Sequence, residues 1–221
     1  MNAGLILKAR VGDGFPTDAT RTYGWRRPHR PSATSVALWL FLVVATSLFS
    51  LFLMAYALRM DSSDWSRIGM PWQLWLSSGL LVAGSLALEG AYVQARHAHM
   101  ESSRGLFLAG GCCGLAFLGV QLWAWRELLA NHVMPIGNPA ASFFYLLTAM
   151  HGLHVVGGLL AWAWTMRHVR QWPVLVGTRS AAQPIGLCAR YWHFLLAVWL
   201  VLFAALGWLT PEVVRFICGT A

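Results

Sequence analysis

An uncharged stretch from Ser142 to Met166 constrains the fold of this chain more than any other feature. It contains no Asp, Glu, Lys or Arg. At a rise of about 1.5 Å per residue, a helix over this stretch crosses a hydrocarbon core about 30 Å thick. Two histidines, His151 and His154, stand near its centre. A histidine at that depth is costly without a partner, so both are candidate functional residues, and their spacing places them on one helix face.

The composition extends this membrane interpretation to the whole chain. Of the 221 residues, 57% are hydrophobic and only 11% are charged, which is too apolar for a soluble domain. The net charge of +8 indicates basic loops facing an anionic lipid leaflet rather than nucleic-acid binding. The four cysteines show no CxxC spacing, so we interpret them as small buried residues and expect no metal site.

We therefore predict an all-α membrane protein with five transmembrane helices. A basic arm, residues 1–33, contains several prolines that discourage a long helix. Polar connections separate the helices, and a short tail, residues 210–221, ends the chain. Connections are expected at 96–104, which is short, and at 126–139 and 167–190. The five expected spans cover residues 34–58, 71–95, 105–125, 142–166 and 190–209.

Small residues predict where these helices pack closely against one another or against a partner. The third span contains Gly110 and Gly114 in GxxxG spacing, and Gly158 follows the paired histidines. In the second span a small residue recurs at every fourth position, at Gly79, Ala83, Ala87 and Ala91.

Glu89 is the one acid placed within a predicted span. Acids inside a membrane are costly and usually mark proton or ion routes. Because Glu89 lies only about six residues from the predicted helix end, we expect it to reach the interface or to pair with a neighbour rather than to shuttle protons.

Two motifs carry a family resemblance. The first is LLTAMHGLHVVGG, residues 146–158, and the second is RYWHFLLAVWLVLF, residues 190–203. Together with PWQLWLSSGLLVAGS, which opens the second span, and QLWAW, which closes the third, they make the chain similar to the cytochrome c oxidase subunit 3 family over residues 34–209. The five-span length resembles the short bacterial form of that family. The residues at the family's motif positions are Thr148, His151, Gly152, His154, Val155 and Gly158 in the first motif, and Tyr191, Trp192, His193, Phe194 and Trp199 in the second.

The resemblance implies a non-catalytic subunit III of a haem-copper terminal oxidase, which reduces oxygen in aerobic electron transport. It implies that this chain holds no cofactor and that the haems and copper lie in partner subunits. It further implies bound phospholipid, packing against the catalytic subunit I, and a location in the bacterial cytoplasmic membrane as a multi-pass protein. In that family the motif histidines make hydrogen bonds between helices, and we expect His151, His154 and His193 to bond to neighbouring helices or to backbone carbonyls. The electron donor, cytochrome c or quinol, stays open.

The chain departs from the family at three positions where many members carry an acid: Ala45, Ala124 and Leu196. These neutral residues argue against a proton relay in this subunit. They also leave open a divergent relative, the accessory protein of the same family that is associated with nitric oxide reductase.

An alternative of another class is a membrane b-type cytochrome that binds haem through His151, His154 and His193. A haem with two histidine ligands needs one ligand from each side of the ring. His151 and His154 project from one face of one helix, and His193 is expected about 10 Å away in depth. Haem ligation is therefore the weaker hypothesis.

The distribution of basic residues predicts the topology. Most of the 16 Lys and Arg residues lie in the arm and in the connections 96–104 and 167–190. The positive-inside rule then places the N-terminus in the cytoplasm and the C-terminus outside.

Labelling from outside intact cells should reach Cys218, or a cysteine introduced at 61–67, and should not reach a cysteine introduced in the arm. Labelling of the arm instead would reverse the orientation.

Overall fold

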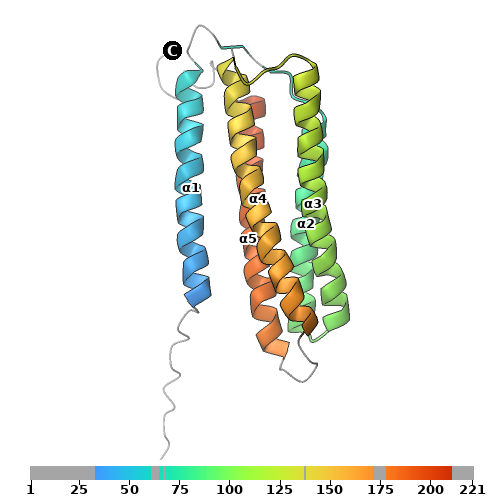
Figure 1. Ribbon diagram of the computed structural model, residues 1–221. Helices are drawn as coiled ribbons and strands as arrows, with labels where there is room; N and C mark the ends of the chain where they lie inside the picture. The colour runs from blue at the N-terminus through green and yellow to red at the C-terminus, as the bar shows by residue number, and fades with distance from the viewer. Residues whose placement is uncertain (1–32, 61–64, 67, 137, 172–177, 211–221) are drawn as a thin grey trace, which may run out of the picture. The chain divides into compact units, whose positions relative to one another are not determined.

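The computed structural model describes residues 33–60, 65–66, 68–136, 138–171 and 178–210. All regular secondary structure in these residues is helical, and each of the five helices is long and apolar enough to cross a membrane. The prediction of an all-α protein with five membrane-spanning helices is therefore confirmed. The predicted basic arm up to residue 32 and the tail from residue 211 lie outside the described residues. The helices are α1 (Ala33–Arg59), α2 (Gln73–Arg96), α3 (Met100–Ala130), α4 (Pro139–Gln171) and α5 (Thr178–Trp208) (Figure 1).

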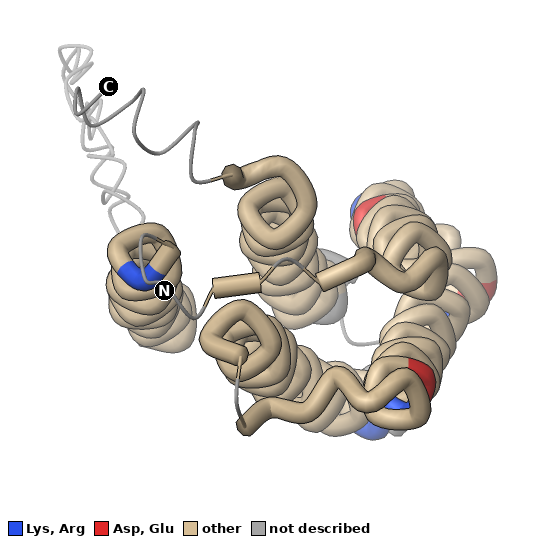
Figure 2. Tube along the Cα trace, turned by 90° about the horizontal axis from the view of Figure 1, so that it is seen from above, with Lys and Arg blue, Asp and Glu red and all other residues tan. Residues whose placement is uncertain are grey.

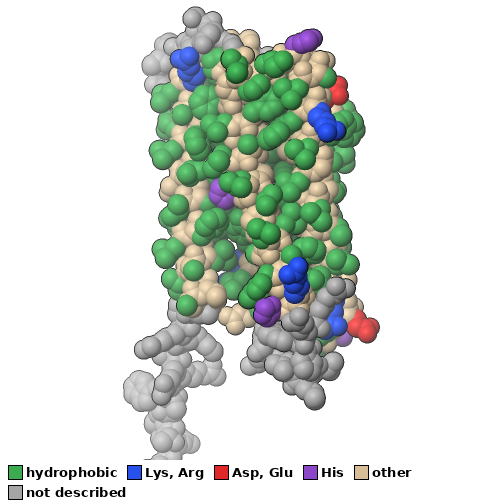
Figure 3. Space-filling view, in the orientation of Figure 1, with side chains coloured by type: hydrophobic (Ala, Val, Ile, Leu, Met, Phe, Trp, Pro, Cys, Tyr) green, Lys and Arg blue, Asp and Glu red, His purple; other side chains and the backbone are tan. Residues whose placement is uncertain are grey.

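The helices pack side by side in alternating directions. Helix α2 packs most closely on α3, α5 packs against both α2 and α4, and α4 also contacts α3. Helix α1 contacts only α4 and α5 to any extent, and it stands at the edge of the group when the helices are viewed end-on (Figure 2). Charged side chains lie toward the two ends of the helices, with hydrophobic side chains between them (Figure 3).

Helix α1 buries little of its surface within this chain. Only Leu42, Ala45, Phe49 and Tyr56 are buried, although the helix is apolar on every side. A helix that is apolar all round faces lipid or another protein wherever its own chain does not cover it.

Three of the helices extend beyond their predicted spans. Helix α3 runs from Met100 to Ala130, α4 continues to Gln171, and α5 begins at Thr178. The expectation of a long polar connection over residues 167–190 is therefore wrong, and those over 96–104 and 126–139 are shorter than expected. Hydropathy marks only the part of a helix that lies in hydrocarbon, whereas backbone hydrogen bonds continue into the polar region beyond it.

The small residues predicted to form one face of α2 do not lie on one face. Gly79 and Ala83 are exposed, Ala87 is partly buried and Ala91 is fully buried. A spacing of four residues advances by about 40° more than a full turn at each step, so the series winds around the helix. Within this chain, α2 instead packs through positions spaced alternately by four and three residues, namely Ser77, Leu81, Gly84, Leu88, Ala91 and Ala95.

The glycines of α3 lie where other helices approach most closely. A Cβ on Gly110 would lie 2.5 Å from Cγ of Leu88, and one on Gly84 would lie 3.1 Å from Cβ of Cys113. Both distances are closer than side chains normally approach, so α2 and α3 owe their tight contact to residues without side chains.

Two further glycines of α3 make room for tryptophan rings. A Cβ on Gly111 would overlap the indole ring of Trp162 on α4, and a Cβ on Gly114 would overlap the indole ring of Trp192 on α5. Trp192 is 1% exposed, so its ring has little freedom to move away. Helix α3 therefore packs against one tryptophan ring from α4 and one from α5.

Replacement of Gly114 by Leu should destabilise the protein, because the new side chain and the ring of Trp192 cannot occupy the same space. Overpacking of this kind costs about 1–3 kcal/mol. Replacement of Gly119 by Leu is the matched control, since nothing lies within 4 Å of a Cβ at that exposed position of the same helix. Thermal unfolding of the purified protein in detergent or lipid measures both, and equal melting temperatures for the two variants would contradict the packing argument.

Candidate functional site

The motif histidines lie on two neighbouring helices, His151 and His154 on α4 and His193 on α5. His151 is completely buried. Its imidazole is surrounded by the rings of Phe49 on α1 (6.4 Å between ring centres), Phe117 on α3 (5.7 Å) and Trp199 on α5 (5.1 Å). Neither ring nitrogen has a hydrogen-bond partner among the described residues. The expectation that His151 bonds to a neighbouring helix is therefore wrong within the described part of the chain.

His154 is held by its own helix and by α1. Its Nδ1 lies 2.7 Å from the carbonyl oxygen of Met150, which can only accept, so Nδ1 carries the proton. Its ring packs on Phe41 and Phe49 of α1, at 5.8 and 5.2 Å. The side chain therefore anchors α1 to α4 and bonds within α4 rather than between helices.

The backbone of His154, rather than its ring, makes the polar contact with α5. The hydroxyl of Tyr191 donates to the carbonyl oxygen of His154 at 2.9 Å. Gly158, one turn further along α4, lies beneath the same tyrosine, because a Cβ there would lie 2.8 Å from Cε1 of Tyr191. These motif residues thus stabilise the contact between α4 and α5.

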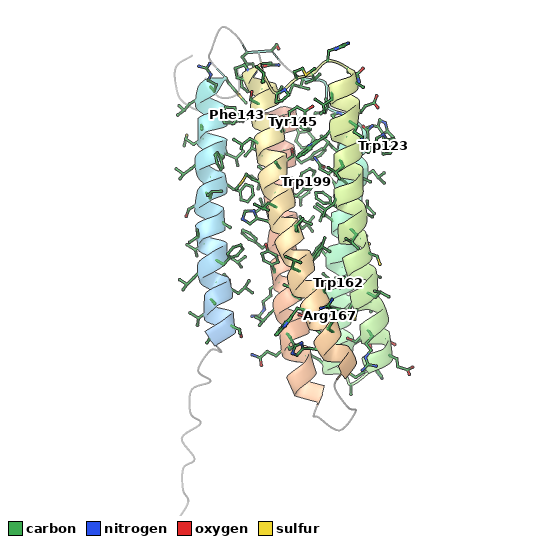
Figure 4. The ribbon with its side chains drawn as sticks, in the orientation of Figure 1. Trp123, Phe143, Tyr145, Trp162, Arg167 and Trp199 are labelled. Atoms are coloured by element: carbon green, nitrogen blue, oxygen red, sulfur yellow. The ribbon has the colours of Figure 1, made fainter. Side chains whose placement is uncertain are left out.

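Thr148 and the motif tryptophans connect the remaining helices. The Thr148 hydroxyl donates to the carbonyl of Phe144 at 2.6 Å and accepts from the indole N–H of Trp125 on α3 at 3.2 Å. Trp199 is 1% exposed and donates its indole N–H to the hydroxyl of Ser78 on α2 at 2.9 Å. Both Trp162 and Trp199 point into the space between the helices (Figure 4).

Gly152 makes less specific contacts. A Cβ on this residue would meet only the end of Leu118, at 3.9 Å. The side chain of an alanine would fit there, so the described contacts do not explain the glycine at this position of the motif.

His193 forms a polar group with two residues of α2. Its Nδ1 lies 2.5 Å from the hydroxyl of Ser85, and its Nε2 lies 3.3 Å from a carboxylate oxygen of Glu89. The side chains of His193 and Glu89 are each 46% exposed. Glu89 therefore has a partner on α5, and the pair lies at the outer edge of the contact between the two helices.

The three histidines do not converge on one cofactor. His151 is closed in by aromatic rings, His154 faces α1, and His193 lies on the outer edge of α2 and α5. His193 is six residues before Trp199, the residue that contacts His151, which corresponds to about 9 Å along α5. Among the described residues, no group of three or more His, Cys, Asp or Glu side chains is placed to hold a metal ion.

The three neutral residues at positions where many family members carry an acid lie in the core or at its edge. Ala45 is 3% exposed and Ala124 is 0% exposed, and Leu196 packs against the main hydrophobic core. An acid at Ala45 or Ala124 would be buried here. The packing at Ala45 and Ala124 suits small apolar side chains.

Sequence reasoning missed several residues that complete the site. Gly84 and Gly111 provide close contacts, Ser78 and Ser85 accept or share hydrogen bonds, and Gln121 is buried in the core. The adjacent pair of Gly110 and Gly111 was a usable signal, since two glycines in one apolar helix can serve two neighbours. The serines and Gln121 carried no such signal, because polar residues at single positions do not show which helix they face.

Curated relatives of this chain share a common description. Over 205 residues, covering 90% of this chain and 98% of the relative, it is 25% identical to a probable cytochrome c oxidase subunit 3 of Mycobacterium tuberculosis. It is 26% identical, with the same coverage, to the corresponding protein of Nocardia farcinica. It is 29% identical over 210 residues to a cytochrome c oxidase subunit 3 of Synechocystis, covering 90% of this chain and 87% of the relative. No known protein-family model matches the chain.

Proposed function

We propose that this chain is subunit III of a haem-copper terminal oxidase and supports oxygen reduction without catalysing it. The observation that carries the proposal is the nearly full-length similarity to proteins named cytochrome c oxidase subunit 3. The motif residues support it, since Tyr191, Trp192 and Trp199 all pack between helices of this bundle. They act here as packing residues.

A non-catalytic role agrees with the surroundings of the histidines. A redox centre needs ligands that meet at one point, and His151, His154 and His193 face three different surroundings. The haems and copper of the complex then belong to partner subunits, and this chain contributes packing and lipid contacts. The b-type cytochrome remains a weaker alternative on the same grounds.

The partners proposed are the catalytic subunit I, other subunits of the complex, and membrane lipid. The outer faces of α1 and α2 are available for them: α1 is largely uncovered, and Gly79 and Ala83 of α2 point away from this chain's own core. Small residues on an outward face allow a partner helix to approach closely. The bacterial cytoplasmic membrane is the proposed location, because the curated relatives named above are bacterial.

An apolar groove between α1, α4 and α5 suits a lipid acyl chain. Its volume is about 460 Å³, and its lining includes Leu38, Phe41, Trp164, Leu187 and Tyr191. The groove lies within helices that can span a membrane. The apolar lining of this groove supports the proposal of a phospholipid contact here.

A second candidate within the same family is the accessory protein associated with nitric oxide reductase. The neutral residues Ala45, Ala124 and Leu196 favour it, because they remove the acids that many oxidase subunits carry. The two candidates differ in the catalytic subunit that accompanies the chain.

Affinity purification of the tagged full-length chain in mild detergent should recover a haem-copper catalytic subunit, identified by mass spectrometry. The haem spectrum should stay with that subunit when the complex is dissociated. The variants His154→Ala and His193→Ala should lower the yield of complex modestly, because each removes an intramembrane hydrogen bond, and such bonds are worth about 0.6 kcal/mol on average. They should leave haem per catalytic subunit unchanged. Recovery of a nitric oxide reductase would favour the second candidate, and haem retained by the isolated chain would favour the cytochrome.

Replacement of Glu89 by Gln should leave turnover and proton uptake of the assembled oxidase unchanged at neutral pH. Gln keeps the size of the side chain and can still bond to His193, and the carboxylate is proposed to serve packing rather than proton transfer. Turnover and proton uptake are measured on the purified complex, with the exposed Glu101→Gln as the control variant. Loss of proton uptake in a fully assembled Glu89→Gln complex, with Glu101→Gln unaffected, would make Glu89 a functional acid.

A further inference from the structure

Several buried polar atoms have no hydrogen-bond partner among the residues that the structure describes: Oε1 of Gln73, the indole nitrogen of Trp192, and every side-chain polar atom of His151 and Gln121. His151 is 0% exposed and neither of its ring nitrogens is bonded. Gln121 on α3 is 4% exposed and neither its amide nitrogen nor its amide oxygen is bonded. A buried polar group left without a partner costs about 1–3 kcal/mol. Two such groups in one small core therefore call for a physical explanation.

The two side chains lie at the same depth on facing helices. Residues 117, 121 and 125 are spaced by four and share one face of α3. Phe117 contacts the ring of His151, and Trp125 donates to Thr148, which lies one turn before His151 on α4. Because α3 and α4 run in opposite directions, Gln121 lies between these two contacts. It is therefore opposite the turn of α4 that carries Thr148 and His151.

The other surroundings of His151 are apolar. The rings of Phe49, Phe117 and Trp199 pack around it, and the indole N–H of Trp199 is directed to Ser78. The hydroxyl of Thr148 already donates to Phe144 and accepts from Trp125. The amide of Gln121 is thus the group on the facing turn of α3 whose hydrogen-bonding capacity is unused.

A direct bond between the two side chains leaves most of that capacity unused. A neutral imidazole has one donor and one acceptor, and an amide has two donors and an acceptor oxygen. A single bond pairs one atom of each and leaves the other nitrogen of His151 and the other amide atom of Gln121 unpaired. A water molecule can both donate and accept, and buried waters typically make about three hydrogen bonds to groups of this kind.

We propose that Gln121 and His151 bind ordered water at the centre of the bundle, and that this water joins α3 to α4. The site lies entirely within this chain. The proposal therefore does not depend on which complex the chain assembles into. The proposed water explains how His151, a polar residue of the first motif, is accommodated among aromatic rings. It also explains why Gln121, which lies outside both motifs, is buried in the core.

A double-mutant cycle on the full-length chain, in the complex from which it is purified, tests the shared site. The variants are Gln121→Met and His151→Leu, which replace each polar side chain by an apolar one of similar size. Each single variant should speed thermal or denaturant unfolding, because it leaves the other polar group poorly bonded. The unfolding rate of the double variant should be at least about threefold lower than the rate expected if the two single effects multiplied, because neither of these two polar groups then remains to lack its partner.

The control pairs His151→Leu with Ser103→Ala. The Ser103 hydroxyl donates to the carbonyl of Ala91 at 2.7 Å, near the opposite end of α3, so the two effects should multiply. If the effects of Gln121→Met and His151→Leu also multiply, the proposal is wrong.

A map of the purified complex that shows ordered water separates bound water from a direct bond. Density for water should lie between the amide of Gln121 and the imidazole of His151, and it should be lost in the double variant. An amide in direct contact with the imidazole and no density between them would overturn the water site. Neither measurement depends on the haem content or on the identity of the catalytic subunit, so failure here is distinguishable from failure of the proposed function.

Discussion

The close approach of helices at glycines is the constraint on which the rest of this structure depends. The indole rings of Trp162 and Trp192 occupy the space where side chains on Gly111 and Gly114 would lie. In a membrane, burial of apolar surface gives little advantage over lipid, so helices associate through close packing and hydrogen bonds. The absence of side chains at Gly111 and Gly114 permits both the close packing and the hydrogen bonds. The indole N–H of Trp162, for example, donates to the carbonyl of Phe107 on α3 at 2.8 Å.

The polar groups of the core follow from that packing. Once α3, α4 and α5 lie this close, hydrogen bonds can connect neighbouring helices, as Trp125 does with Thr148 and Tyr191 with the carbonyl of His154. The histidines are accommodated in three different ways: His154 by its own helix, His193 by α2, and His151 within a ring of aromatic side chains. The histidines of the two motifs thus have different local surroundings.

The bundle leaves much of its apolar surface to its surroundings. Helix α1 rests on α4 and α5 through few residues, and the outward face of α2 carries Gly79 and Ala83 with open space above Gly79. Such a bundle agrees with the proposed role as a subunit of a larger membrane complex, because much of its apolar surface is left uncovered by its own helices. The polar pair of Glu89 and His193 lies on the edge of the same outer surface.

The sequence by itself determined the fold class, because uncharged stretches as long as Ser142 to Met166 leave the helix as the structure that can cross a bilayer and satisfy its own backbone. It also identified Gly110 and Gly114, since the spacing of four on an apolar helix is a local property. Only the tertiary structure decided which helix each face meets. The series from Gly79 to Ala91 winds around α2, and the partner of Glu89 and the aromatic surroundings of His151 are residues more than 30 positions away in the sequence. Such contacts arise from packing between helices, and no local pattern encodes them.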